Sequence, residues 1–348
     1  MTSEHAPSLY TPESESHCHM KTVYAYQPFP HTFHKSLYLA GPTSREATVS
    51  SWRPQAVQLL EACSYDGVVF LPEAYDGKRQ GGYDQQMEWE LEAMRRSDIL
   101  LFWVPATKDT LPAHTTRVEF GFQVHSGKVI FGAPRNAYRT RYMEKLARKY
   151  HLASHHTLEE TVAAALTKLG GGAARSGAEC LVPLDLWRAP HFQQWYAAQT
   201  AAGHTLADLP KIEWVFRVGA DRAFPLFMAL HVAVKVCGED RIKSNEAVII
   251  RPSMVTVCAY CPGDTRAHDR FILVKEYRTS VMNEQGFVFE LPGGSSVQPG
   301  GDPIAVARDE LEEETGIRLA RERFRMLGQR QIAATMIASI NTAVSGSI

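Results

Sequence analysis

The first half of the chain alternates short apolar runs with stretches of helical periodicity. The apolar runs occupy residues 36–41, 68–72, 98–105 and 128–134. The helical stretches occupy residues 50–63, 85–96, 115–127, 139–150 and 157–168. Strands that are apolar throughout, rather than at every second position, indicate a parallel sheet covered on both faces. The pattern therefore predicts an α/β domain of three layers over residues 36–169.

The segments on either side of this domain differ from it in composition and in the spacing of apolar residues. Residues 1–35 are rich in His, Ser, Pro and Tyr and lack apolar periodicity, which predicts a disordered tail. The glycine-rich residues 170–180 predict a flexible linker. An aromatic-rich helix or helix pair at 184–202 lies in a helical connector, residues 181–211. From 212 to 348 strand patterns dominate around one strong helix at 303–315, which predicts an α+β domain with a mixed sheet.

Composition narrows the classes of function. The 37 Lys and Arg residues balance the 38 Asp and Glu residues, giving a net charge of -1, whereas a dedicated nucleic-acid binder would show a basic excess. No apolar run of about 18 residues is present, so we expect no membrane span, and the start of the chain has no signal-peptide pattern. The six cysteines among 348 residues favour reduced thiols and a cytoplasmic location. Whether the chain forms a homo-oligomer stays open.

The helix at 303–315 carries the sharpest chemical pattern. Asp302 and Pro303 open it, and Glu310, Glu313 and Glu314 follow at i, i+3 and i+4, which places three carboxylates within one turn. Like charges so close repel unless a cation neutralises them. Hard oxygen ligands select Mg²⁺ or Mn²⁺, and these ions grip pyrophosphate oxygens. The alternative is a solvated acidic helix face.

This segment resembles the Nudix box, G-x5-E-x7-R-E-U-x-E-E-x-G-U. Glu310-Leu311, Glu313-Glu314 and Gly316-Ile317 match its second half position by position. The stretches FILVKEYR and FELPGG upstream are similar to the strands that flank the box in ADP-ribose and nucleotide-sugar hydrolases. The resemblance covers about residues 212–348 and implies Mg²⁺-dependent hydrolysis of a nucleoside diphosphate derivative, with the three glutamates as metal ligands.

The box also departs from the family pattern. Its first Glu falls on Gly301, and its Arg falls on Asp309, with Arg308 shifted by one position. In the family this Arg helps to orient the metal-binding Glu, and here Asp302 and Arg308 are the candidates to compensate. The family fold would continue with a further strand and helix beyond Ile348, so the domain is expected to be short at its C-terminal side.

In the first half, candidate chemistry gathers where the strands end. Ligands of open parallel sheets bind outside the carboxyl ends of the strands, which here are followed by Gly41-Pro42-Thr43 and by Pro72-Glu73. Glu119 is expected at the start of the helix opened by TTRVEFG, where the helix N-terminus would favour its ionised form. An ionised carboxylate is a nucleophile for an anomeric carbon. The alternative is a Glu that merely adds a favourable charge to the helix.

The segments LYLAGPTSR, WELEAMRRSDILLFWVP and TTRVEFGFQVHSGKVIFG together resemble the nucleoside 2-deoxyribosyltransferase family, in particular its second branch, over about residues 36–150. The resemblance implies that Glu119 forms a covalent glycosyl intermediate and that Glu90, eight positions before Asp98, binds the sugar hydroxyls. It places Tyr38, Gly41, Pro42 and Asp98 in the substrate-binding segments and implies no cofactor for this domain.

The acid that handles the proton on the base in this family falls on Ala113. Asp109 and His114 in the same loop are the candidates to replace it.

Together the patterns predict a flavodoxin-like or Rossmann-like parallel-sheet domain followed by an α+β Nudix-like domain. The expected function lies in nucleotide metabolism: cleavage or transfer at an N-glycosidic bond by the first domain, and Mg²⁺-dependent hydrolysis by the second. Its ligands would be nucleosides and nucleotides, with no nucleic acid and no membrane. The alternative is a sensor whose Nudix-like domain binds a nucleotide or ADP-ribose without turnover.

Overall fold

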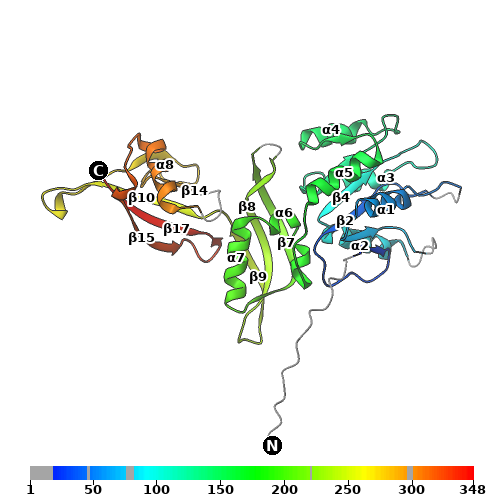
Figure 1. The fold of residues 1–348 in the computed structure, drawn as a ribbon, viewed down its shortest axis with the longest axis horizontal. Helices are drawn as coiled ribbons and strands as arrows, with labels where there is room; N and C mark the ends of the chain where they lie inside the picture. The colour runs from blue at the N-terminus through cyan, green and yellow to red at the C-terminus, as the bar shows by residue number, and fades with distance from the viewer. Residues whose placement is uncertain (1–18, 45–47, 76–81, 220–221, 296–300) are drawn as a thin grey trace, which may run out of the picture. The chain divides into compact units, whose positions relative to one another are not determined.

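The computed structural model describes residues 19–44, 48–75, 82–219, 222–295 and 301–348 (Figure 1). The chain divides into two compact units. The first contains residues 34–146 and 154–172 together with the segment that ends at Phe29. The second contains residues 30–33, 147–153 and 173–348.

The first unit is built on a six-stranded sheet in which all strands are parallel. In spatial order the strands are β1 (Lys21–Tyr24), β3 (Val68–Leu71), β2 (Ser36–Ala40), β4 (Ile99–Trp103), β5 (Val129–Gly132) and β6 (Ser154–His155). Every residue of β2, β3 and β4 is buried, because helices cover both faces of the sheet. The predicted parallel sheet is therefore confirmed.

Five helices surround this sheet: α1 (Arg53–Ala62), α2 (Tyr83–Arg96), α3 (His114–Gln123), α4 (Arg141–Lys149) and α5 (Leu158–Leu169). Phe120 of α3 packs against Phe102 of β4 and Phe131 of β5. Gly132, the next residue of β5, faces Thr161 of α5. Because successive strand residues point to opposite faces, α3 and α5 cover opposite faces of the sheet. The three-layer architecture follows, with α1 packed beside α5.

Two expectations about irregular segments are wrong. The disordered tail was expected to reach residue 35, but Lys21–Tyr24 form a strand that pairs with β3; residues 1–18 lie outside the described residues. Four residues are too few to show a periodicity. The expected linker is also structured, since Ser176 and Glu179 form a capping box that opens the 3₁₀ helix η1 (Gly177–Leu181), and Arg175 is buried. Glycine content permits flexibility, but these contacts fix the backbone.

The second unit begins with this 3₁₀ helix and continues with a helix pair, α6 (Leu184–Trp187) and α7 (Pro190–Ala201). A four-stranded sheet follows, in the order β16 (Ile337–Ala338), β9 (Ile242–Ile250), β8 (Phe224–Lys235) and β7 (Thr205–Val218). The boundary expected at 212 falls inside β7.

A second sheet contains β11 (Arg270–Phe271), β10 (Met254–Cys261), β17 (Ile340–Ser347) and β15 (Phe324–Gln331), and β14 (Gly293–Ser295) also pairs with β10. A hairpin joins β12 (Val274–Tyr277) to β13 (Phe287–Glu290). The 3₁₀ helix η3 (Arg266–His268) lies between β10 and β11, and a second one, η4 (Arg321–Arg323), directly precedes β15. Since β10 and β17 are parallel and the other pairs are antiparallel, the sheet is mixed, as predicted.

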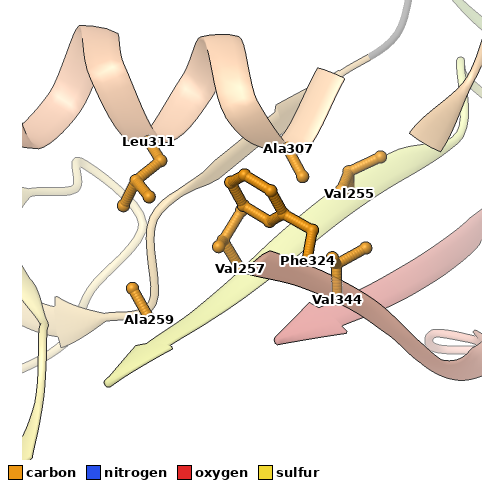
Figure 2. Packing of buried hydrophobic residues seen from close by; sticks show 7 residues of the cluster. All are labelled: Val255, Val257, Ala259, Ala307, Leu311, Phe324 and Val344. Carbon is orange, nitrogen blue, oxygen red and sulfur yellow. The ribbon is translucent and has the colours of Figure 1, made fainter. Parts of the chain in front are cut away.

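Helix α8 (Pro303–Thr315) covers this mixed sheet. Asp302 caps its first turn by accepting a hydrogen bond from the Ile304 N–H, and Gly316 ends it with a φ of 73°. Ala307 and Leu311 point from the helix onto the core formed by the strand residues Val255, Val257, Ala259, Phe324 and Val344 (Figure 2). The predicted start and end of this helix are confirmed.

Two findings bear on the expected environment of the chain. Among the described residues no helix has the length and apolar character that crossing a membrane requires. The five cysteines of the described part are all free.

Candidate functional site

Glu119 is the central acid of the first unit, and its placement corrects one expectation. It is the sixth residue of α3, so it lies beyond the first helical turn, where a helix N-terminus would favour the ionised form. Its side chain is half-buried. Burial first, and then the negative charge of Glu90, raise the pKa of Glu119 to about 7, while the positive charge of Arg53 acts in the opposite direction.

Tyr38 and Glu90 share this environment. Tyr38 lies in β2 with 1% of its surface exposed, and burial, Glu90 and Glu119 together raise the pKa of its phenol well above its usual value. The carboxylate of Glu90, on α2, accepts a hydrogen bond of 2.7 Å from Gln86. A strand and two helices thus bring together Tyr38, Glu90 and Glu119, which are far apart in the sequence.

The loop after β2 is held tightly at the edge of the sheet. A Cβ atom on Gly41 would lie 2.2 Å from the carbonyl oxygen of Trp103 and 2.7 Å from the indole of Trp52, so only glycine fits this approach. The carbonyl of Pro42 accepts a hydrogen bond of 3.2 Å from the Trp52 indole N–H. Gly41 and Pro42 therefore form a rigid rim at the carboxyl end of the strand.

Arg53 is a site residue that the sequence analysis missed. It is 1% exposed, and its guanidinium donates to the carbonyl oxygens of Leu39 and Gly41, to the Thr43 hydroxyl and to the Glu73 carboxylate. The only signal in the sequence was a cation in the first turn of the helix that follows the first strand of the predicted site. Such a residue is usually a solvated charge.

Three expected site residues lie elsewhere. Asp98 precedes β4, at the amino end of the sheet, and its carboxylate accepts hydrogen bonds from the N–H and the hydroxyl of Ser36 at 2.9 and 3.1 Å. It fastens β2 to β4, and it is not among the charges that shift the pKa of Glu119. Asp109 and His114 are exposed, and neither is among the charges that shift the pKa of Glu119. The position of Ala113 is the buried, left-handed N-cap of α3.

In the second unit, the acidic residues of α8 meet the glycine strand β14. A Cβ atom on Gly294 would lie 2.1 Å from a carboxylate oxygen of Glu310, and Glu314 accepts a hydrogen bond of 3.1 Å from the Gly293 N–H. Burial, followed by the charges of Glu313, Glu314 and Asp309, raises the pKa of Glu310. The acidic stripe predicted from the sequence is therefore present. Its glutamates repel one another at Glu310, whereas the Gly293 N–H and the charge of Arg278 act in the opposite direction on the pKa of Glu314.

The donors suit a hard cation, but they are not assembled into a metal site. No group of three His, Cys, Asp or Glu side chains in the described segments is close enough together to hold a metal ion. The two candidates to compensate for the box Arg are also engaged elsewhere. Arg308 binds the carboxylate of its neighbour Asp309 at 2.9 Å, and Asp302 caps α8 and pairs with Arg321.

Arg251, between β9 and β10, is a further residue that the sequence did not reveal. Its guanidinium donates to the Ser295 hydroxyl at 2.6 Å, beside the glycine strand, and lies 5.2 Å from the ring centroid of Phe227. Its Nε is buried without an acceptor among the residues that the structure describes. Burial lowers its pKa, and no carboxylate in the described part of the chain is among the groups that shift it. A half-buried cation of this kind can receive an anionic group.

An aromatic row continues from this cation across the sheet. Phe227 of β8 pairs with Phe216 of β7 at 6.1 Å between ring centroids, and Phe216 stacks on Trp214 at 5.8 Å. Trp214 is 52% exposed. Exposed aromatic faces next to an arginine offer stacking and charge to the same ligand.

Comparison with known families finds a likeness for part of the first unit. Residues 34–137 match the family model for nucleoside 2-deoxyribosyltransferase-like proteins. This deoxyribosyltransferase-like segment contains Tyr38, Gly41, Glu90 and Glu119, as well as Arg53. In the comparison with curated proteins, none matches the chain.

Among solved structures, one that matches is described as "Crystal structure of ADP compounds hydrolase". The identity is 23%, the match covers 40% of this chain, and the TM-score is 0.27. The chain spans 66% of the length of that protein, slightly less than two thirds.

Proposed function

We propose that the first unit cleaves or transfers the sugar at an N-glycosidic bond of a nucleoside or nucleotide. The observation that carries the proposal is Glu119, a half-buried carboxylic acid. Burial and the negative charge of Glu90 raise its pKa to about 7. At neutral pH roughly half of it is ionised, so it can act as a nucleophile.

The chemistry follows that of a retaining glycosyl transfer. A Glu119 oxygen forms a bond to the anomeric carbon while the bond from that carbon to the base nitrogen breaks, and the electron pair leaves with the base. In this proposal Glu90 accepts hydrogen bonds from the sugar hydroxyls. Water or a second base then attacks the glycosyl ester and restores the carboxylate. Asp109 and His114 remain candidates for the proton on the leaving base, since Asp109 lies in the loop before α3 and His114 is the first residue of that helix, which also carries Glu119.

The experiment is incubation of the full chain with a panel of nucleosides, nucleotides, NAD and ADP-ribose, with free base measured by chromatography. Glu119→Ala should abolish base release, because the nucleophile is lost. Glu88→Gln, on the exposed side of α2, is the matched control and should release base at the wild-type rate. Release by Glu119→Ala at the wild-type rate would show that this carboxylate is not the nucleophile.

For the second unit, we propose Mg²⁺-dependent hydrolysis of a nucleoside diphosphate derivative. Supporting observations are the acidic stripe against Gly294 and the unbalanced cation Arg251, which together suit a ligand with phosphate groups and a divalent ion. Mg²⁺, or Mn²⁺, would be held by Glu310, Glu313 and Glu314 and would polarise phosphate oxygens.

A sensor is the second candidate for this unit. It is favoured by Asp309 at the position of the box Arg and by Arg308, whose guanidinium is bound to Asp309. Calorimetric titration with ADP-ribose and Mg²⁺, run beside a product assay, separates the two. Binding without product supports the sensor. Product that disappears in Glu313→Gln supports the hydrolase.

A further inference from the structure

The Arg53 guanidinium binds the loop that follows β2, and its positive charge acts on Glu119. We propose that Arg53 is a positioning residue of the glycosyl-transfer site: it fixes the loop Gly41–Thr43 and holds a permanent positive charge next to the Glu90–Glu119 pair. The inference rests on the proposed function of the first unit and names the residue that sets its geometry and its pH range.

The hydrogen bonds of Arg53 show that it acts inside the protein. Nε donates to the Leu39 carbonyl at 3.0 Å, Nη2 donates to the Gly41 carbonyl at 2.7 Å, and Nη1 donates to the Thr43 hydroxyl at 2.8 Å. Nη1 also donates to Glu73 at 2.6 Å. A guanidinium has five N–H groups, and these contacts use four of them. Arg53 therefore holds the pocket rim and is not the group that grips the substrate.

Glu73 fixes the guanidinium from the next strand. Its carboxylate, just after β3, accepts a hydrogen bond from Arg53. The single hydrogen of the Ser51 hydroxyl is shared between the two carboxylate oxygens, at 2.8 and 3.0 Å. The Ser51 hydroxyl in turn accepts from the Arg53 N–H at 3.1 Å. Among the described residues, Glu73 is the carboxylate that directly contacts the buried guanidinium of Arg53. Its negative charge therefore weakens the effect of the Arg53 charge on Glu119.

The charged and titratable groups that face Glu119 come from three elements. They are Glu90 of α2, Tyr38 of β2 and Arg53 of α1. Glu90 favours the protonated form of Glu119 and Arg53 favours the ionised form, which is the nucleophile. Glu73 acts on this balance through its pairing with Arg53. Removing the positive charge should therefore move the onset of activity to higher pH, and removing Glu73 should move it to lower pH.

The test compares three variants by the pH profile of base release and by NMR titration of the Glu119 carboxyl carbon, assigned as the signal missing from Glu119→Gln. Arg53→Gln should raise the midpoint by about one pH unit, the lower end of the effect of a nearby opposite charge. At pH 7 this is an about fivefold loss of activity that is recovered near pH 9. Glu73→Gln should lower the midpoint. It also serves as the deciding variant if Arg53→Gln does not fold.

Arg53→Lys separates the charge from the geometry. An ammonium keeps the positive charge but cannot reproduce the fork of donors, so the midpoint should stay near that of the wild type while kcat/KM falls at every pH. A purely structural Arg53 would lower activity without moving the midpoint in either Gln variant, and that result would overturn the inference. The NMR arm needs no turnover. If Glu119 shifts as described but no substrate in the panel releases base, the proposed function fails and the role of Arg53 stands.

Discussion

Replacing the Glu119 carboxylate by an amide should stabilise the first unit at alkaline pH. In the folded chain the pKa of Glu119 is raised from 4.5 to about 7, so the native state binds its proton more tightly than the unfolded state does. The stability that this proton provides is fully present below pH 4.5 and is lost as the pH rises through 7. Above that pH the folded protein carries the negative charge of Glu119 in a half-buried position next to Glu90.

The magnitude follows from the shift. A rise from 4.5 to about 7 corresponds to about 3 kcal/mol, because one pKa unit is about 1.4 kcal/mol. Water reaches the half-buried side chain and Glu90 relaxes in part, so we expect about half of this value for Glu119→Gln at pH 8. In a domain of this size 1 kcal/mol moves the melting temperature by roughly 2–4 °C, which gives a rise of about 3–6 °C.

Scanning calorimetry of the full chain at pH 5 and pH 8 measures this effect. The transition of the first unit should rise in Glu119→Gln at pH 8 and change much less at pH 5. Glu88→Gln, exposed on α2, removes a charge without a buried environment and should leave both transitions in place. A melting temperature that falls at pH 8, or a gain that is equal at both pH values, would refute the assignment of a raised pKa to Glu119.

Three further outcomes can be measured. Mg²⁺ at about a hundredfold excess over its Kd should stabilise the second unit by about 2.7 kcal/mol, and Glu310→Gln should reduce this shift in the melting transition. Gly294→Ala should leave the fold intact but abolish the Mg²⁺ effect, because the new Cβ takes the place of the Glu310 carboxylate at 2.1 Å; an unchanged Mg²⁺ response would contradict this. Asp98→Ala should cost about 1–3 kcal/mol by leaving the buried Ser36 N–H without an acceptor, and it should not move the pH profile of base release.

The sequence by itself determined the elements that have a strong period. Wholly apolar runs such as 99–103 became buried parallel strands, since burial on both faces leaves no position for a polar side chain. Asp302, Pro303 and Gly316 marked the ends of α8, because capping depends on neighbouring residues alone. The glutamates of that helix lie on one stripe for the same local reason.

The tertiary structure alone decided the electrostatics of the first site. From the sequence, Glu119 was predicted to lie at the start of a helix and to ionise readily. Its pKa depends instead on burial and on the charges of Glu90 and Arg53, which belong to other helices. Likewise Asp98 was expected in a substrate-binding segment because of its spacing in the family motif. It lies instead at the amino end of the sheet, where its carboxylate accepts a hydrogen bond from the Ser36 N–H. The local pattern specifies which residues are near in the chain. Which charges meet in space depends on the spatial order of the strands. That order cannot be inferred from any one segment of the sequence.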